Sequence, residues 1–222
     1  DGKAIVAETY PNERIVRWNQ DAHVDHTFST KSWLNDSTKI NDILALPDGK
    51  LLVAGYFTNN KGSLIKLLSD GKIDNTFNVV LPNLTHKKIL LQPDGKIILL
   101  GSYGVIRLNP DGHTDNTFNS NNGVGFINTY PTKMALQPNG KILVVGATYN
   151  GIYKSLIRLN SDGSVDNTLD ITHTSGTSAI IVQSDGKILV GKFTGNLIRL
   201  NPDGSLDNTF NPDTQHQLSV RW

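Results

Sequence analysis

The protein has 222 residues, a formal net charge of +1 and no cysteine. This charge gives no electrostatic basis for binding nucleic acid or an anionic membrane, and the absence of cysteine excludes disulfides and thiolate metal sites. The sequence has no run of about 18 apolar residues, so no membrane insertion is predicted.

One three-residue phrase, Asp/Asn-Gly-Lys, recurs along the chain about every 46 residues. Its five copies are Asp1-Gly2-Lys3, Asp48-Gly49-Lys50, Asp94-Gly95-Lys96, Asn139-Gly140-Lys141 and Asp185-Gly186-Lys187. Each copy leads into an apolar run, a loop, a second apolar run and a second turn, and then closes on Asp-(Asn/His)-Thr-(Phe/Leu). A fixed period of this length predicts a repeat architecture.

The fourth copy illustrates the elements expected in each repeat. Its strands are expected at residues 133–137, 141–146, 156–160 and 164–169, with turns at 138–140 and 161–163 and a loop at 147–154. The second strand is too continuously apolar to face water. Four antiparallel strands joined by tight glycine-containing hairpins predict one blade of a β-propeller.

The order of the repeats indicates how the blades would assemble. The chain begins in mid-repeat with a second strand, Lys3 to Ala7, and ends with a first strand, residues 218–222. We therefore expect a single all-β domain over residues 1–222, a five-bladed β-propeller of four-stranded antiparallel blades. Pairing of the C-terminal strand with the N-terminal strand would close the ring and remove its exposed sheet edges. An open solenoid and a fragment of a larger ring are the alternatives.

The repeat sequence itself resembles a known family. Residues 136–146 (LQPNGKILVVG), 155–169 (SLIRLNSDGSVDNTL) and 201–211 (NPDGSLDNTFN) are similar to the delta-60 repeats of bacterial secreted proteins, a propeller-like domain of unknown function. The resemblance covers essentially the whole chain, although the first copy departs from it with Asp21-Ala22 in place of Asp-Gly. It implies a secreted or cell-surface bacterial protein, often multidomain, and it supplies no activity or catalytic residues.

A basic residue stands eight positions before the acidic residue of every closing motif. The pairs are Arg17 and Asp25, Lys66 and Asp74, Arg107 and Asp115, Arg158 and Asp166, and Arg199 and Asp207. In the last copy, a hairpin that places Leu200 opposite Leu206 also places Arg199 opposite Asp207, so we expect a structural cross-strand ion pair. A ring of arginines that captures anions is the alternative. The residues that end the motif, Phe28, Phe77, Phe118, Leu169 and Phe210, are predicted to wedge between neighbouring blades.

Metal binding has little support in the sequence. Residues 201–207 carry closely spaced side-chain oxygens but lack the alternating acidic spacing of calcium loops, so we interpret them as turn-bracing side chains. The histidines, His23, His26, His86, His113, His173 and His216, occupy different repeat positions. No metal site and no cofactor is predicted.

Aromatic residues follow the second strand of every repeat. They are Tyr10, Tyr56, Phe57, Tyr103, Tyr149 and Phe193. In a closed ring they would gather on one face, where aromatic rings suit sugars and flat ligands. Packing of these rings between blades is the alternative.

Catalysis is not predicted. Propeller glycosidases need carboxylates that converge on the central channel, and the channel position of the first strands carries Asp42, Lys88, Lys133, Ala179 and Ser219. Only one of these is acidic. We expect a non-catalytic ligand-binding propeller, lectin-like and glycan-binding through repeated loop sites. A rigid scaffold or protein-interaction domain of a larger secreted protein is the alternative.

Overall fold

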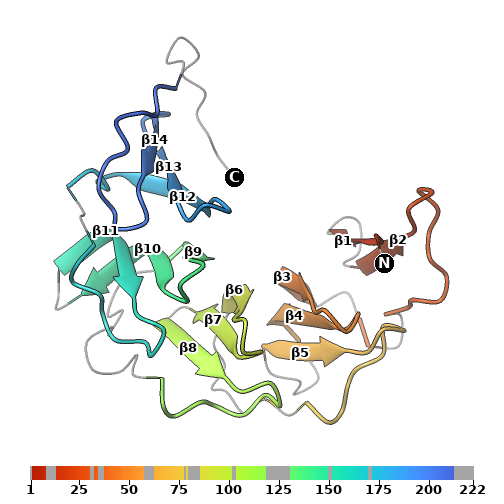
Figure 1. Ribbon diagram of the computed structural model, residues 1–222. Coiled ribbons are helices and arrows are strands. Elements are labelled where there is room, and N and C mark those ends of the chain that lie inside the picture. Colours follow the sequence, from red (N-terminus) through yellow and green to blue (C-terminus); the bar gives the residue numbers. More distant parts are fainter. Residues whose placement is uncertain are drawn as a thin grey trace. The chain divides into compact units, whose positions relative to one another are not determined.

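The computed structural model describes residues 2–8, 14–30, 33–34, 38–57, 63–77, 79, 86–101, 104–118, 131–149, 152–169 and 172–212. Every regular element in these ranges is a β-strand, as predicted (Figure 1). The strands are β1 (Ala4–Glu8), β2 (Arg14–Trp18), β3 (Lys39–Ala45), β4 (Leu51–Tyr56), β5 (Leu64–Leu67), β6 (His86–Leu91), β7 (Ile97–Gly101), β8 (Gly104–Leu108), β9 (Lys133–Leu136), β10 (Ile142–Tyr149), β11 (Ile152–Leu159), β12 (Thr177–Val182), β13 (Ile188–Lys192) and β14 (Leu197–Leu200). The described part has no helix long and apolar enough to cross a membrane.

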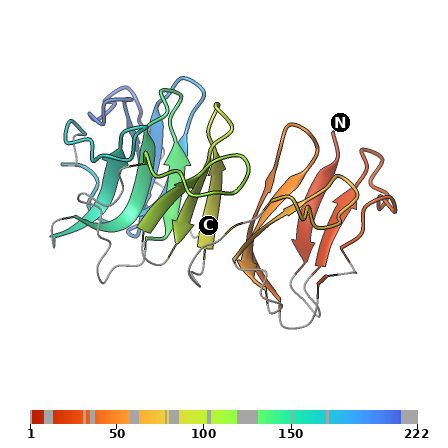
Figure 2. The same ribbon diagram turned by 90° about the horizontal axis from the view of Figure 1, so that it is seen from below.

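Each repeat forms one sheet. The strand orders are β1-β2, β3-β4-β5, β6-β7-β8, β9-β10-β11 and β12-β13-β14, with the second strand of each repeat in the middle of the three-stranded sheets. Figure 2 shows that the strands within each sheet lie side by side. In the fourth repeat, Val144 lies opposite Met134 on one side and Ile157 on the other. Residues 142–145 of this strand are at most 1% exposed, so both of its faces are covered, and this explains why the strand is apolar on both faces.

Turn chemistry fixes the register of the hairpins. Gly140 adopts a φ of 80°, and its amide donates to the Gln137 carbonyl at 2.9 Å. The Asn139 side chain accepts a hydrogen bond from the Lys141 amide at 3.1 Å. Glycine adopts this left-handed conformation without a Cβ clash, and Asx side chains brace the turn. The recurring Asp/Asn-Gly-Lys motif therefore forms the tight turn that reverses the direction of the chain.

The prediction of four-stranded blades is not supported, because the fourth segment contributes a single bridge. These bridges join Trp18 to Val24, Leu67 to Ile73, Leu108 to Thr114, Leu159 to Val165 and Leu200 to Leu206. In the fourth repeat, the Asp166 amide still donates to the Arg158 carbonyl at 2.8 Å. The Asp166 carboxylate then binds the amide and hydroxyl of Thr168, and this turn leads the chain away from the sheet.

The described part of the chain divides into two compact units. One comprises Asp1–Leu91, Gly95–Leu99 and Arg107–Thr114, and the other comprises Gln92–Asp94, Leu100–Ile106 and Asp115–Trp222. Each has its own apolar core. Phe28 packs among residues of β2, β4 and β5 in the first unit, and Leu169 packs among residues of β10, β11, β13 and β14 in the second. Both residues are wedged between neighbouring sheets, as predicted.

The first repeat differs from the others because its sheet has two described strands, β1 and β2. The strand expected to complete it, residues 218–222, lies outside the described residues. Closure of the ring therefore stays a prediction.

Candidate functional site

The closing aspartate of the fourth repeat, Asp166, lies at the centre of a buried polar cluster. Its Oδ2 accepts hydrogen bonds from Arg158 Nε and Lys141 Nζ, each at 2.6 Å. Its Oδ1 accepts from the Thr168 amide at 2.9 Å and the Thr168 hydroxyl at 2.6 Å. The carboxylate is thus fully engaged by a charged pair on one oxygen and a turn on the other, and we call this arrangement the closing-Asp cluster.

The same cluster recurs in other repeats. It comprises Asp25, Arg17, Lys3 and Thr27 in the first repeat and Asp207, Arg199, Lys187 and Thr209 in the fifth. In the second repeat, Asp74 binds Thr76, with Lys50 at 3.7 Å and Lys66 in place of arginine. The predicted pairing of Arg199 with Asp207 is confirmed at 2.7 Å, and the pair is more buried than a surface ion pair.

The sequence interpretation missed the lysine of this cluster. Lys141 ends the Asn-Gly-Lys turn and reaches the aspartate closing the same repeat. A lysine ends all five copies of Asp/Asn-Gly-Lys, and this regularity could have revealed its role. The turn itself requires only the glycine and the Asx residue, so a lysine kept in every copy indicates a further contact.

These contacts hold the carboxylates in their ionised form. The pKa of Asp207 lies well below its ordinary value because Thr209 and Lys187 donate hydrogen bonds to it, with Arg199 adding a further one. For Asp166, burial acts to raise the pKa, but the hydrogen bonds from Lys141 and Thr168 outweigh it and the net shift is strongly downward. A carboxylate with a depressed pKa is a poor proton donor or acceptor near neutral pH.

The arginine also ties one sheet to the next within each unit. Arg17 Nη1 donates to the Ser69 carbonyl at 2.6 Å, and Arg158 Nη1 donates to the Pro202 carbonyl at 2.7 Å. Both acceptors belong to the second turn of the following repeat. The Arg17 guanidinium also lies 4.8 Å from the centre of the Phe28 ring. The closing-Asp cluster is therefore a structural joint between sheets.

Asp42, the single acidic residue at the predicted channel position, also has structural partners. Its carboxylate accepts hydrogen bonds from Lys88 Nζ at 3.0 Å and from the Ile89 amide at 2.7 Å. Both donors belong to β6, in the same unit. Asp42 thus links the first strands of two consecutive repeats.

The aromatic residues predicted to bind a ligand differ in how far they are exposed to solvent. Tyr56 and Phe193 are exposed, at 57% and 76%, whereas Phe57 is only 8% exposed and its ring meets Trp33 edge-on at 6.0 Å. Phe57 is therefore a core residue, and its ring is not available as one of the predicted ligand-binding aromatics. Tyr10 and Tyr103 lie outside the described residues. Tyr149 ends β10, but its side chain is not among those described.

The segment considered for calcium forms an Asx turn. Asp203 Oδ1 accepts from the Ser205 amide at 2.9 Å and the Ser205 hydroxyl at 2.8 Å. Over the described residues, no group of three or more His, Cys, Asp or Glu side chains is placed to hold a metal ion.

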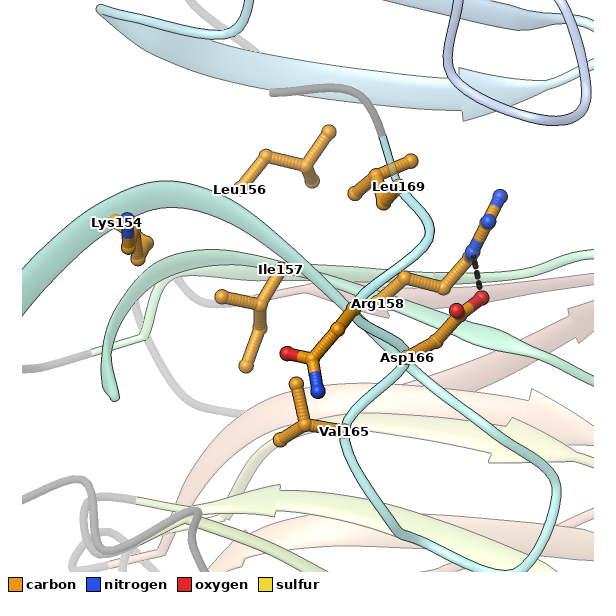
Figure 3. A pocket seen from close by; sticks show the side chains of 8 residues that line it. Lys154, Leu156, Ile157, Arg158, Val165, Asp166 and Leu169 are labelled. Atoms are coloured by element: carbon orange, nitrogen blue, oxygen red, sulfur yellow. Dashed lines mark hydrogen bonds and ion pairs between the residues drawn. The ribbon is translucent and has the colours of Figure 1, made fainter. Parts of the chain in front are cut away.

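A pocket of about 170 Å³ lies along β11 in the second unit. Figure 3 shows Leu156 and Leu169 on one side of this strand and Ile157 and Val165 on the other, with Lys154 at one end. Arg158 and Asp166 form the opposite end, already paired with each other. The pocket therefore follows the outer edge of the sheet, where a fourth strand was expected.

Several solved structures are similar to this chain, and one of them is a WD40 β-propeller domain. A catalytically inactive virginiamycin B lyase from Staphylococcus aureus aligns with a TM-score of 0.60 and 16% identity, over 91% of this chain and 67% of its own. The WD40 propeller domain of Doa1 aligns with a TM-score of 0.61 and 18% identity, over 90% and 60%. The structure of YCF48 bound to D1 peptide aligns with a TM-score of 0.61 and 13% identity, over 94% and 64%. At these identities the likeness shows the fold alone, and the chain spans about two thirds of these structures or less.

No curated protein sequence matches the chain. A family model does match, over residues 46–77, 92–118, 137–169 and 183–210, which together exceed half of the chain. These segments hold the two turns and the closing motif of the second to fifth repeats. The chain therefore belongs to the family described as domain of unknown function (DUF5122) beta-propeller.

Proposed function

We propose that this propeller is a non-catalytic, rigid domain that binds a protein partner within a larger secreted or cell-surface bacterial protein. The observation that carries the non-catalytic and rigid parts of this proposal is that the described closing-Asp clusters use the recurring carboxylates as structural joints. Asp42 is likewise bonded on both oxygens, by Lys88 Nζ and by the Ile89 amide, whereas the closing aspartates are in addition held ionised. Carboxylates that are ionised and already bonded on both oxygens do not supply the acid and base that hydrolysis requires.

The proposal includes a closed ring of five blades. The two described strands of the first sheet, against three in each of the others, support closure by residues 218–222. Deletion of residues 218–222 is expected to lower the Tm by roughly 5 °C, because it would remove a strand and its packing. An unchanged Tm would contradict closure.

Glycan binding is a second candidate, and one observation favours it. The Phe193 ring is exposed although its own amide donates to the Gly176 carbonyl at 2.9 Å, so a fixed backbone presents an apolar ring to solvent. Tyr56 is exposed as well. Rings held in this manner suit the apolar faces of sugars.

The two candidates are separated by identifying and reconstituting the partner. In-cell crosslinking of the full-length protein would identify neighbours, and calorimetry with each purified neighbour would measure direct binding. We expect one protein to bind with unchanged affinity after enzymatic removal of its glycans and after Tyr56→Ala and Phe193→Ala. Binding that disappears with the glycans or with these two substitutions would favour the lectin function instead.

A further inference from the structure

We propose that one end of the second unit is a docking site for the surface of a lipid bilayer that contains anionic lipids. This end carries exposed apolar side chains at the tips of two neighbouring hairpins and three lysines beside them, and we call it the lysine-rich end. The function goes beyond the protein binding proposed above, because a bilayer is a different class of ligand and can be tested without any protein partner.

Apolar side chains at the two hairpin tips are exposed to water. Ile152 and Tyr153 begin β11 at the tip of the β10–β11 hairpin and are exposed at 60% and 57%. Phe193 follows β13 in the turn that leads to β14 and is exposed at 76%. Large apolar side chains that gather in one place on the surface mark a site that binds an apolar partner.

The two tips lie at the same end of the second unit, and Gly176 links them. The Gly176 amide donates to the Ser155 hydroxyl at 3.2 Å, and Ser155 is two residues from Tyr153. The Gly176 carbonyl accepts from the Phe193 amide at 2.9 Å. An added Cβ at Gly176 would meet no atom within 4 Å, so the chain between the tips borders open space. A single surface can therefore contact both tips.

Lysines surround the apolar tips. They are Lys133 at the start of β9, Lys154 in β11 and Lys192 at the end of β13. Each belongs to one of the last strand pairs at this end. The described residues that make up this end, 131–133, 147–149, 152–155, 172–178 and 191–197, contain no Asp or Glu. The lysine-rich end is therefore complementary to an anionic surface.

The turns at the opposite end of the second unit carry negative charge. Their exposed aspartates are Asp162, Asp185 and Asp203. Lys141 and Lys187, which also lie at that end, are ion-paired with the closing aspartates of their own repeats. The net charge of +1 for the whole chain conceals this separation of charge. The field of an anionic surface therefore attracts the lysine-rich end and repels the opposite one.

A bilayer suits these tips better than a rigid protein surface does. The apolar side chains belong to separate hairpins, and a fluid bilayer accommodates separate tips without a matched pocket. Apolar side chains at such a surface enter the boundary between head groups and acyl chains by about 5–10 Å. Tyrosine is enriched at that boundary, and lysine side chains extend toward the head groups. Each lysine near an anionic surface strengthens binding about fivefold.

Sedimentation of the 222-residue protein with vesicles tests the site. The vesicles would contain phosphatidylcholine and phosphatidylglycerol in equal amounts, or phosphatidylcholine alone. Salt would be raised from about 0.01 M to about 1 M, which shortens the screening length from about 30 Å to about 3 Å. We expect binding to the mixed vesicles at low salt, and binding at least tenfold weaker at high salt or without phosphatidylglycerol. No binding to the mixed vesicles, or equal binding to both kinds, would overturn the proposal.

Substitutions of exposed side chains locate the contact. Phe193→Ala and Tyr153→Ala are each expected to weaken binding to the mixed vesicles about tenfold, because an apolar side chain is no longer buried in the bilayer. Ile181→Ala is the matched control, since Ile181 is exposed at 56% in the same unit but lies toward the opposite end of β12. Equal binding by all three variants would overturn the proposal.

Charge reversal tests the lysines separately. Lys154→Glu is expected to weaken binding to the mixed vesicles about fivefold or more, because an attraction becomes a repulsion. Lys72→Glu makes the same change of charge at an exposed lysine of the second repeat and should leave vesicle binding unchanged. The same affinity for both variants would overturn the role of the lysine-rich end.

Phe193→Trp measures insertion in a variant that keeps an aromatic ring at this tip. Vesicles with brominated acyl chains are expected to quench its added fluorescence, because the ring would lie about 5–10 Å deep. The parent protein, with its three native tryptophans, gives the baseline. Equal quenching in variant and parent would overturn the proposal. Because the vesicles contain neither protein nor glycan, failure of the vesicle experiments would leave the proposed function standing.

Discussion

The fourth and fifth repeats share the same polar joint but differ in what surrounds it. The Arg158 side chain is 3% exposed and reaches the Pro202 carbonyl of the next sheet, whereas the Arg199 side chain is 21% exposed and contacts Asp207 and the Phe210 ring. The β10–β11 hairpin has eight residues per strand, against five and four for β13–β14. The comparison shows that the closing-Asp cluster is kept in both repeats, while the length of the hairpin differs between them.

The largest expected effect comes from removing the aspartate at the more buried joint. Asp166→Ala leaves Arg158 and Lys141 without their shared carboxylate, and breaking a buried pair in this way costs about 3 kcal/mol of unfolding free energy. Urea denaturation would measure it. Asp207→Ala should cost less because Arg199 is more accessible to water. Equal losses would show that burial of the arginine does not set the strength of the joint.

Shortening the arginine tests the link between sheets. Arg158→Lys is expected to cost about 1.5 kcal/mol, because it loses the charged hydrogen bond to the Pro202 carbonyl. Arg199→Lys should have a smaller effect, and the second repeat already carries Lys66 at this position. Thermal unfolding of the two variants and the parent protein would measure the loss of stability caused by each substitution. A larger loss of stability for Arg199→Lys than for Arg158→Lys would contradict a stabilising link through Arg158.

Acid should weaken both joints. The pKa of Asp166 and of Asp207 is lower in the folded protein than the ordinary value of 3.8 that an unfolded chain would show. The stabilisation is therefore complete only well above this value, and it is lost as the pH falls from about 5 toward the folded pKa. Asp166→Asn is expected to make the decline of Tm between pH 5 and pH 2.5 shallower. The same slope in the variant and the parent would exclude Asp166 as a contributor.

The smallest effect is expected at the tip of the long hairpin. Ile152→Ser and Tyr153→Ser should change the unfolding free energy by about 0.5 kcal/mol or less, since both side chains are exposed. Chemical denaturation would measure this change. Losses above about 1 kcal/mol would show that packing of these two side chains holds the hairpin in place.

Local signals in the sequence determined the repeat, the turns and the register. The hairpin at 138–140 and the pairing of Leu200 with Leu206 follow from glycine at a left-handed position and from turn length, both of which act over a few residues. The family assignment depends on these same segments. The all-β class and the wedge positions of Phe28 and Leu169 were predicted for this reason.

Only the tertiary structure decided which of these residues are available for function. Tyr56 and Phe57 are neighbours in the sequence, yet one is exposed and the other packs against Trp33, because burial depends on what the next segment places there. The fourth segment forms one bridge, and directly after it the Asp166 carboxylate binds Arg158, Lys141 and Thr168. Lys141 lies 25 positions before Asp166 in the sequence, and a contact over this distance depends on how the strands between them pack rather than on a short-range signal.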